Sequence, residues 1–168
     1  MVARVVFCED EKENELIRDI ARNMRKMDVF ELEAIGYTDR EQAIKDGMDG
    51  SEITMIFGRR EKPVCIFGVS KEEYAGGRII WCLGTDGIDE CKKSFVRESR
   101  RVLKDWTEEY GMLFNFVSVK NKKAVAWLKR MGAVFHEPRP INEKGDMFMM
   151  FTIGGAKNVQ CDSGADGA

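Results

Sequence analysis

Six side chains of this 168-residue sequence are candidates for donating or accepting a proton in an enzyme site. They are Glu72, Glu73, Cys82, Tyr110, Ser118 and His136. The sole histidine would titrate near pH 7, but a lone histidine on a strand near the end of a chain is more often a surface or packing residue. No spacing singles out any of the six, so the sequence alone assigns no catalytic residue.

The cysteines do not form a recognisable chemical motif. They are Cys8, Cys65, Cys82, Cys91 and Cys161. Their number is odd, no pair has the C-x-x-C spacing, and a single histidine cannot complete a metal site with them. Three of them, at positions 8, 65 and 82, lie inside apolar runs, where a free thiol behaves as a small core side chain. The sequence therefore predicts reduced thiols and no metal, with Cys161, in a polar tail, the most accessible.

Composition limits the class of protein further. The length suits one domain with one core. The longest apolar runs reach about eight residues, against the roughly 20 that a membrane-spanning helix needs. No signal peptide is visible after Met1, because the first strand leads into the acidic run Glu9–Glu11. We therefore expect a cytoplasmic protein with no membrane partner.

Basic residues gather on one predicted helix without making the protein basic. The chain carries 27 Lys and Arg against 29 Asp and Glu, a net charge of -2. The basic residues are Lys92, Lys93, Arg97, Arg100, Arg101 and Lys104. Five acids lie among these six bases, so a solvated helix face is the better interpretation and nucleic-acid binding is the weaker alternative.

Residues 112–135 form the best-defined structural unit. An apolar run from Met112 to Val119 predicts a strand, and the apolar positions that follow repeat with a helical period. Asn121 is a favoured helix N-cap and Gly132 suits the left-handed position just past a helix end. Apolar residues then resume at 133–135. The order is therefore strand, Asn, helix, Gly, strand.

The other elements follow from the same patterns. The near-continuous apolar run at 79–83 predicts a central strand, buried on both faces, and residues 71–77 and 138–145 read as turns. Strands are expected at Ala3–Cys8, Ile53–Phe57, Val64–Val69, Arg78–Leu83 and Met147–Ile153, and helices at Glu13–Met27, from Thr38 or Asp39 to Gly47–Gly50, and at Asp89–Tyr110, with a further apolar run at Val29–Ile35.

This order of elements, with the string N-x-x-A-V-x-x-L-x-x-M-G from Asn121 to Gly132, resembles the Gcn5-related N-acetyltransferase (GNAT) family. The resemblance covers residues 3–153. It implies an α/β (α+β) fold with a mixed, mostly antiparallel sheet, splayed fourth and fifth strands and about four flanking helices. We accordingly expect a single domain at 1–153 and a flexible polar tail at 154–168.

In that family acetyl-CoA lies between the splayed strands, with its pyrophosphate on the loop that opens the long helix. By position the resemblance assigns cofactor binding to this loop and to the residue that leads the next helix. These residues are Leu83, Gly84, Thr85, Gly87, Ile88 and Asn121. The loop lacks the family's motif of Gln or Arg, two residues, Gly, any residue, then Gly or Ala.

Acidic residues at this loop favour a competing interpretation. Asp86, Asp89 and Glu90 would satisfy the helix dipole and repel a pyrophosphate, and Lys92 and Lys93 would offset this only in part. A helix capped by its own side chains is therefore the alternative to a phosphate site. A second departure is Leu128, which stands where many family members have a proton-donating tyrosine. Leu128 and the adjacent Trp127 are expected to fill core.

A narrower resemblance joins four strings, Y-T-D-R-E at 37–41, the hairpin at 51–67, I-W-C-L-G-T at 80–85 and A-W-L-K-R-M-G at 126–132. Together they are similar to small GNAT-like proteins of T7-like podophages, which are described as acetyltransferases or internal virion proteins. Two functions follow. One is acetyl transfer from acetyl-CoA to an amine. The other is an inactive fold that binds a host or phage protein, in the host cytoplasm or the virion.

The last strand leaves the oligomeric state open. Residues 147–151 are all apolar and show no alternation. They could form an exposed patch that supports a homodimer, or a strand that is buried within the chain.

Overall fold

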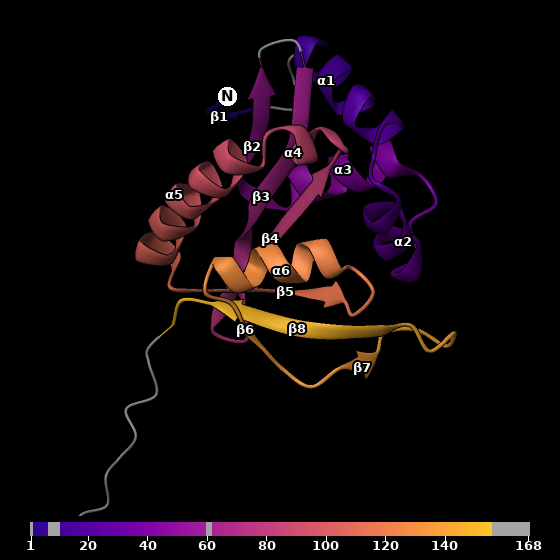
Figure 1. Cartoon of the computed structure of the whole chain (residues 1–168), viewed down its shortest axis with the longest axis vertical. Coiled ribbons are helices and arrows are strands. Elements are labelled where there is room, and N and C mark those ends of the chain that lie inside the picture. The colour runs from indigo at the N-terminus through magenta and orange to yellow at the C-terminus, as the bar shows by residue number, and fades with distance from the viewer. Residues whose placement is uncertain (1, 7–10, 60–61, 156–168) are drawn as a thin grey trace, which may run out of the picture.

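The computed structural model describes residues 2–6, 11–59 and 62–155 (Figure 1). The strands are β1 (Val2–Val5), β2 (Ser51–Arg59), β3 (Lys62–Tyr74), β4 (Gly77–Gly84), β5 (Met112–Ser118), β6 (Val134–Phe135), β7 (Arg139–Pro140) and β8 (Met147–Ile153). The helices are α1 (Glu11–Arg22), α2 (Lys26–Ala34), α3 (Arg40–Asp49), α4 (Gly87–Glu90), α5 (Lys92–Tyr110) and α6 (Lys122–Arg130). None of these helices has the length and hydropathy to cross a membrane.

The strands form one sheet in the order β1-β2-β3-β4-β5-β8-β6, with β7 also paired to β8. Within the described part of the chain, β4 and β5 are the parallel neighbours and the other pairs are antiparallel. The β4–β5 register joins Gly77–Ile79 to Met112–Phe114 and goes no further. Beyond it the two strands separate, so the predicted mixed sheet with splayed fourth and fifth strands is confirmed.

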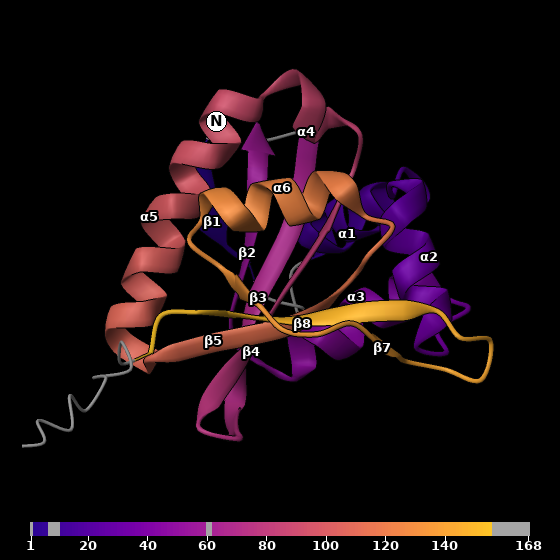
Figure 2. The same ribbon diagram turned by 60° about the horizontal axis from the view of Figure 1, so that its bottom comes forward.

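Two apolar layers cover the two faces of the sheet. Alternate residues of β2 and β3 contribute to each layer: Phe57 and Cys65 pack with α5, whereas Ile56 and Ile66 pack with α1 and α3. Figure 1 shows α5 and the helices α1 to α3 on opposite sides of β2 to β4. In Figure 2, α6 lies between the β5–β8 pair and α4, next to α5.

The unit at 112–135 forms as predicted. The Asn121 side chain accepts a hydrogen bond from the Ala124 amide at 3.2 Å, which caps α6. Gly132 has φ +83°, the left-handed conformation that costs glycine little. Each of these residues acts on a helix end next to it in sequence, which explains why the unit could be predicted from the sequence alone.

The N-terminal helices differ from expectation. The helix predicted at 13–27 ends at Arg22, and the run at 29–35 lies mostly inside a separate helix, α2. That makes six helices in the described residues, against about four expected. Helix α2 buries Asp28 and Leu32. Because one of its buried residues is a carboxylate, apolar periodicity cannot reveal the helix.

Boundaries elsewhere also differ, and β2 is longer at both ends than the predicted strand at 53–57. Strand β3 continues to Tyr74, so Glu72 and Glu73 are exposed strand residues and do not lie in a loop. The predicted helix at 89–110 is broken at Cys91 into α4 and α5. The predicted turn at 138–145 contains the short strand β7. The last strand matches its predicted bounds, and Phe148 and Phe151 are buried, which favours the buried reading of its apolar run.

Candidate functional site

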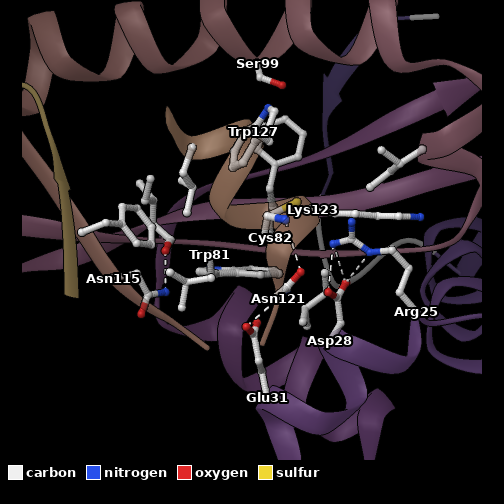
Figure 3. A pocket seen from close by; sticks show the side chains of 18 of the residues that line it. Arg25, Asp28, Glu31, Trp81, Cys82, Ser99, Asn115, Asn121, Lys123 and Trp127 are labelled. Carbon is white, nitrogen blue, oxygen red and sulfur yellow. Dashed lines mark hydrogen bonds and ion pairs between the residues drawn. The ribbon is translucent and has the colours of Figure 1, made fainter. Parts of the chain in front are cut away.

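A cavity of about 720 Å³ opens where β4 and β5 separate. Its walls come from β4, β5, α2, α5 and α6, and Figure 3 shows its polar side chains. The Asn115 side chain lies at the fork itself and donates to the Ile80 carbonyl across the gap at 2.6 Å. The fork is therefore held at its base by a side chain in place of the next backbone pair.

Strand β4 presents an open backbone edge to this cavity. The Ile80 carbonyl faces it, as do the amide and carbonyl of Gly84, which bond to Asp28 and Arg25. Backbone groups of a strand alternate in direction with period two. The amide and carbonyl of Cys82 consequently face the same edge, beyond the end of the β4–β5 pairing.

Glu31 reaches the cavity from α2. Its Oε1 accepts hydrogen bonds from the Ser118 amide at 2.9 Å and from the Asn121 side chain at 3.2 Å. Both hydrogen bonds use the same oxygen, so in the described structure Oε2 carries none (Figure 3). Burial raises the pKa of Glu31 to about 7, and the two hydrogen bonds offset that rise only in part. This carboxyl group is therefore half-ionised near neutral pH.

A buried ion pair joins α2 to the loop after β4. Arg25 donates through Nε and Nη2 to both oxygens of Asp28 at 2.9–3.1 Å. Asp28 Oδ2 also accepts the Gly84 amide at 2.8 Å. Burial is the largest influence on Asp28 and raises its pKa, although Arg25 opposes this. The pair thus fixes α2 against β4, beside the cavity.

The loop predicted to hold a pyrophosphate uses its amides internally. The amides of Thr85 and Ile88 donate to the carbonyls of Val64 and Thr85 at 2.8 and 3.2 Å, and the Gly87 amide donates to Thr85 Oγ1 at 3.2 Å. Of the six residues assigned to the cofactor by resemblance, Leu83, Ile88 and Asn121 line the cavity. The other three do not line it: Gly84 ends β4, Thr85 follows that strand, and Gly87 begins α4.

A side chain does bond the first-turn amide of α4, as the alternative of a self-capped helix predicts, but it is Thr85 Oγ1 that accepts from Gly87, and the Asp86 side chain makes no capping hydrogen bond. Asp89 pairs with Lys123 of α6 and with Lys92 of α5. The hydrogen bond from Lys123 is the main reason that the pKa of Asp89 is lowered. An ion pair therefore links α6 to α4 beside the loop.

Leu128 is buried in the core, as expected. Trp127 packs against Phe95 with ring centroids 5.5 Å apart and lines the cavity between α5 and α6. Its indole Nε1 is buried and has no hydrogen-bond partner among the described residues. A buried donor without a partner costs about 1–3 kcal/mol, so this atom marks a place where a bound acceptor would be stabilised.

The six proton-transfer candidates separate by position. Cys82 lines the cavity, and Ser118 is buried beside it, where its amide bonds Glu31. Tyr110 lies under the Arg78 guanidinium, 4.5 Å from the ring centroid. His136 is exposed on the surface, as expected, and Glu72 and Glu73 are exposed on β3.

The thiols agree with the sequence where they are described. Cys65 and Cys91 are buried and Cys82 is half-buried. Burial is the main reason that the pKa of the Cys65 thiol is well above its usual value. Cys8 and Cys161 lie outside the described residues.

Sequence reasoning missed the polar residues of α2. Arg25, Asp28 and Glu31 come together with β4, β5 and α6 through the fold, across 56 to 90 positions of sequence. The available signal was their spacing of three, which places them on one side of a helix. The spacing is informative only when residues 26–34 are known to form a helix.

Acetyl-CoA fits part of this geometry. The open edge of β4 offers the Cys82 amide and carbonyl to an arm that itself contains amides, and the cavity volume lies in the range of small-molecule sites. Four amides at the predicted pyrophosphate loop, those of Gly84, Thr85, Gly87 and Ile88, are already bonded, and Asp86 and Asp89 stand near them. The residues of the cavity therefore fit the arm of acetyl-CoA, whereas the loop predicted to bind the pyrophosphate does not fit the phosphate groups.

Comparisons with known proteins establish the fold but not the function. A family model described as "Bacteriophage T7, probable scaffold protein Gp13" matches residues 68–138, which is less than half of the chain. No curated protein matches the sequence.

Solved structures match along nearly the whole chain. The ribosomal-protein-S18-alanine N-acetyltransferase of Escherichia coli has a TM-score of 0.64 at 8% identity, with 95% of this chain and 98% of that chain covered. An acetyltransferase of the GNAT family from Bacillus anthracis has a TM-score of 0.61 at 11% identity, with coverage of 90% and 93%. An aminoglycoside 6'-N-acetyltransferase complexed with coenzyme A has a TM-score of 0.64 at 8% identity, with coverage of 92% and 97%. Such low identities establish architecture and nothing finer, and that architecture is the GNAT fold.

Proposed function

We propose that this protein is an N-acyltransferase that moves the acetyl group of acetyl-CoA to an amine. The observation that carries the proposal is the cavity at the fork of β4 and β5, which combines an open strand edge with the Glu31 carboxylate. Acetyl-CoA would supply the acetyl group as a thioester. The acceptor is an unidentified amine, and the GNAT neighbours act on amines of different kinds by their names.

Each wall of the cavity has a role in this proposal. The amide and carbonyl of Cys82 hold the donor's arm along β4, and Leu83, Ile88 and Asn121 contribute to the surface beside it. Ile80 and Val117 exclude water from the fork. Excluding water strengthens the polar interactions within the site and suppresses hydrolysis of the thioester.

Glu31 is the proposed general base. A base must have a free lone pair near the proton that it takes, and Oε2 has no partner in the described structure. Its pKa of about 7 suits proton transfer at neutral pH. Leu128 cannot return a proton to the leaving thiolate. Water reaching the open side of the cavity is the proposed carrier for that proton.

The test is a thermal melt of the full chain with acetyl-CoA, and with free coenzyme A as the control. Ligand at about a hundred times its dissociation constant stabilises the native state by roughly 2.7 kcal/mol, a rise of several degrees in a domain of this size. A shift of that size should be followed by thiol release in a panel of polyamines, aminoglycosides and N-terminal peptides. If millimolar acetyl-CoA does not raise the melting temperature, the proposal is wrong.

A second function has its own supporting observations. The bonded loop amides and the match of residues 68–138 to a phage protein described as a probable scaffold favour a binding protein that keeps the fold without the reaction. In that proposal the protein binds a phage or host protein, in the host cytoplasm or within a virion, as a monomer or a homodimer. A melt that acetyl-CoA leaves unchanged would favour this function.

A further inference from the structure

A second hollow, of about 580 Å³, lies on the outer side of α5. Apart from Val96, every residue that lines it is basic. The basic residues are Lys92, Lys93, Arg97, Arg100, Arg101, Lys104 and Arg130. They come from one side of α5 and from the C-terminal end of α6, where the Arg100 side chain donates to the Arg130 carbonyl at 3.4 Å.

The acids of α5 neutralise only part of this hollow. Arg101 pairs with Glu98 and Asp105, and Lys104 pairs with Glu108. Lys93 and Arg97, by contrast, have no ion pair or hydrogen bond among the described residues, and both are exposed. The first turn of α5 also lacks an acid, so its helix dipole adds to the positive potential. Glu98 also attracts Arg97 electrostatically, but seven basic side chains line the hollow, so its middle keeps an excess of positive charge.

The two hollows adjoin. Lys92, Val96 and Arg130 line both of them. The unpartnered Trp127 Nε1 lies in the wall of the first cavity, between the same two helices. A ligand that passes from the fork to the basic side chains would cross this donor, and an acceptor on that ligand would satisfy it.

The alternative exit, along the loop before α4, is already occupied. Asp28 takes the Gly84 amide and Thr85 takes that of Gly87. The Lys123–Asp89 ion pair connects α6 to α4 on this side. An anionic group would there meet carboxylates in place of free amides.

We propose that the basic hollow on α5 binds the phosphate groups of a ligand whose acylated arm lies in the cavity, so that the ligand leaves between α5 and α6 and not over the loop. The identity of the arm rests on the proposed function, and the anion site does not. Charge complementarity and the shared walls of the two hollows carry the assignment.

The experiment compares coenzyme A with pantetheine, which has the arm and no phosphate, by calorimetry on the full chain. The variant is Lys93→Gln with Arg97→Gln, which removes two exposed charges that form no ion pair or hydrogen bond in the described structure. The matched control is Arg139→Gln with Lys144→Gln, two exposed residues in β7 and in the turn before β8. We expect the first variant to bind coenzyme A about tenfold more weakly and pantetheine equally well, and the control to match the native chain.

The outcomes separate the two proposals. If the Lys93/Arg97 variant binds coenzyme A as tightly as the native chain does, the anion site is wrong and the acyltransferase stands. If neither coenzyme A nor pantetheine binds, the acyltransferase fails, and inorganic tripolyphosphate then decides the anion site by whether its binding is lost in the same variant. Tighter binding of a short single-stranded oligonucleotide than of either phosphate ligand would assign the hollow to nucleic acid and overturn the inference.

Discussion

Among single side chains, Glu31 has the clearest consequence for the whole molecule. Its pKa is raised from 4.5 to about 7, so between these values the folded protein binds a proton that the unfolded chain does not. Stability from this group is therefore greatest below pH 4.5, and it is lost as the pH rises through 7. A difference of that size corresponds to roughly 3 kcal/mol as an upper estimate.

We predict that Glu31→Gln removes this pH dependence. Glutamine keeps an Oε1 that can accept from the Ser118 amide and the Asn121 side chain, but it cannot ionise. The variant should melt above the native chain at pH 8 and close to it at pH 5. Glu33→Gln, an exposed change on the same helix, is the control. Equal melting shifts at both pH values would contradict the assignment.

The same variant tests the proposed base. Loss of a general base costs about 10²- to 10⁴-fold in turnover, and the rise of the native rate around pH 7 should disappear with it. Binding of coenzyme A should be unchanged, since no bond of Glu31 involves the open edge of β4. Unchanged turnover would leave Glu31 as a structural residue between α2 and α6.

Among the elements, α2 depends most on a buried charge pair. Asp28 is 2% exposed and bonds both Arg25 and the Gly84 amide, so helix and loop share one carboxylate. Removing one partner of such a pair leaves an uncompensated charge, at a cost of about 3–5 kcal/mol. Removing both charges costs much less when the remaining hydrogen bond is preserved.

We predict that Asp28→Asn destabilises the protein by about 3 kcal/mol, and that Arg25→Met restores most of this loss when added to it. The asparagine side chain can still accept the Gly84 amide, so the double variant loses the two charges and the hydrogen bonds between them but keeps the bond to β4. Urea unfolding at pH 7 would measure both. If the double variant is as unstable as the single one, the loss reflects packing and not the isolated Arg25 charge.

The same elements explain what the sequence could and could not reveal. The unit at 112–135 was predictable because Asn121 and Gly132 act on their own helix ends and the strands beside them are apolar. Helix α2 was not, because Asp28 turns inward to meet a loop 56 residues away. The candidate site depends on that helix. The fold could therefore be predicted from periodicity and resemblance. Glu31 could be identified as a candidate site residue only from the position of α2 in the structure.

Across the fold, the two apolar layers share the strands that separate them. Neighbouring residues of β2, Ile56 and Phe57, belong to different layers, and so do Cys65 and Ile66 of β3. Neither layer can lose its packing without exposing a face of the strands that support the other. We therefore propose that the predicted domain at 1–153 unfolds as a single cooperative unit.

The three tryptophans allow that unit to be tested. Trp81 packs against the layer of α1 and α3 and donates to Ser51 Oγ at 2.9 Å, whereas Trp106 and Trp127 belong to the layer of α5. Two variants are made in a chain ending at Gly155: Trp81→Phe, and Trp106→Phe combined with Trp127→Phe. We predict that each variant unfolds in urea with a single fluorescence midpoint. That midpoint should equal the midpoint that far-ultraviolet circular dichroism gives for the same variant. Trp127→Phe should itself cost little, because it removes a buried donor that has no partner in the described structure. Midpoints that differ between fluorescence and dichroism in either variant would mean that the two layers unfold separately, and the domain would then have to be divided along the sheet.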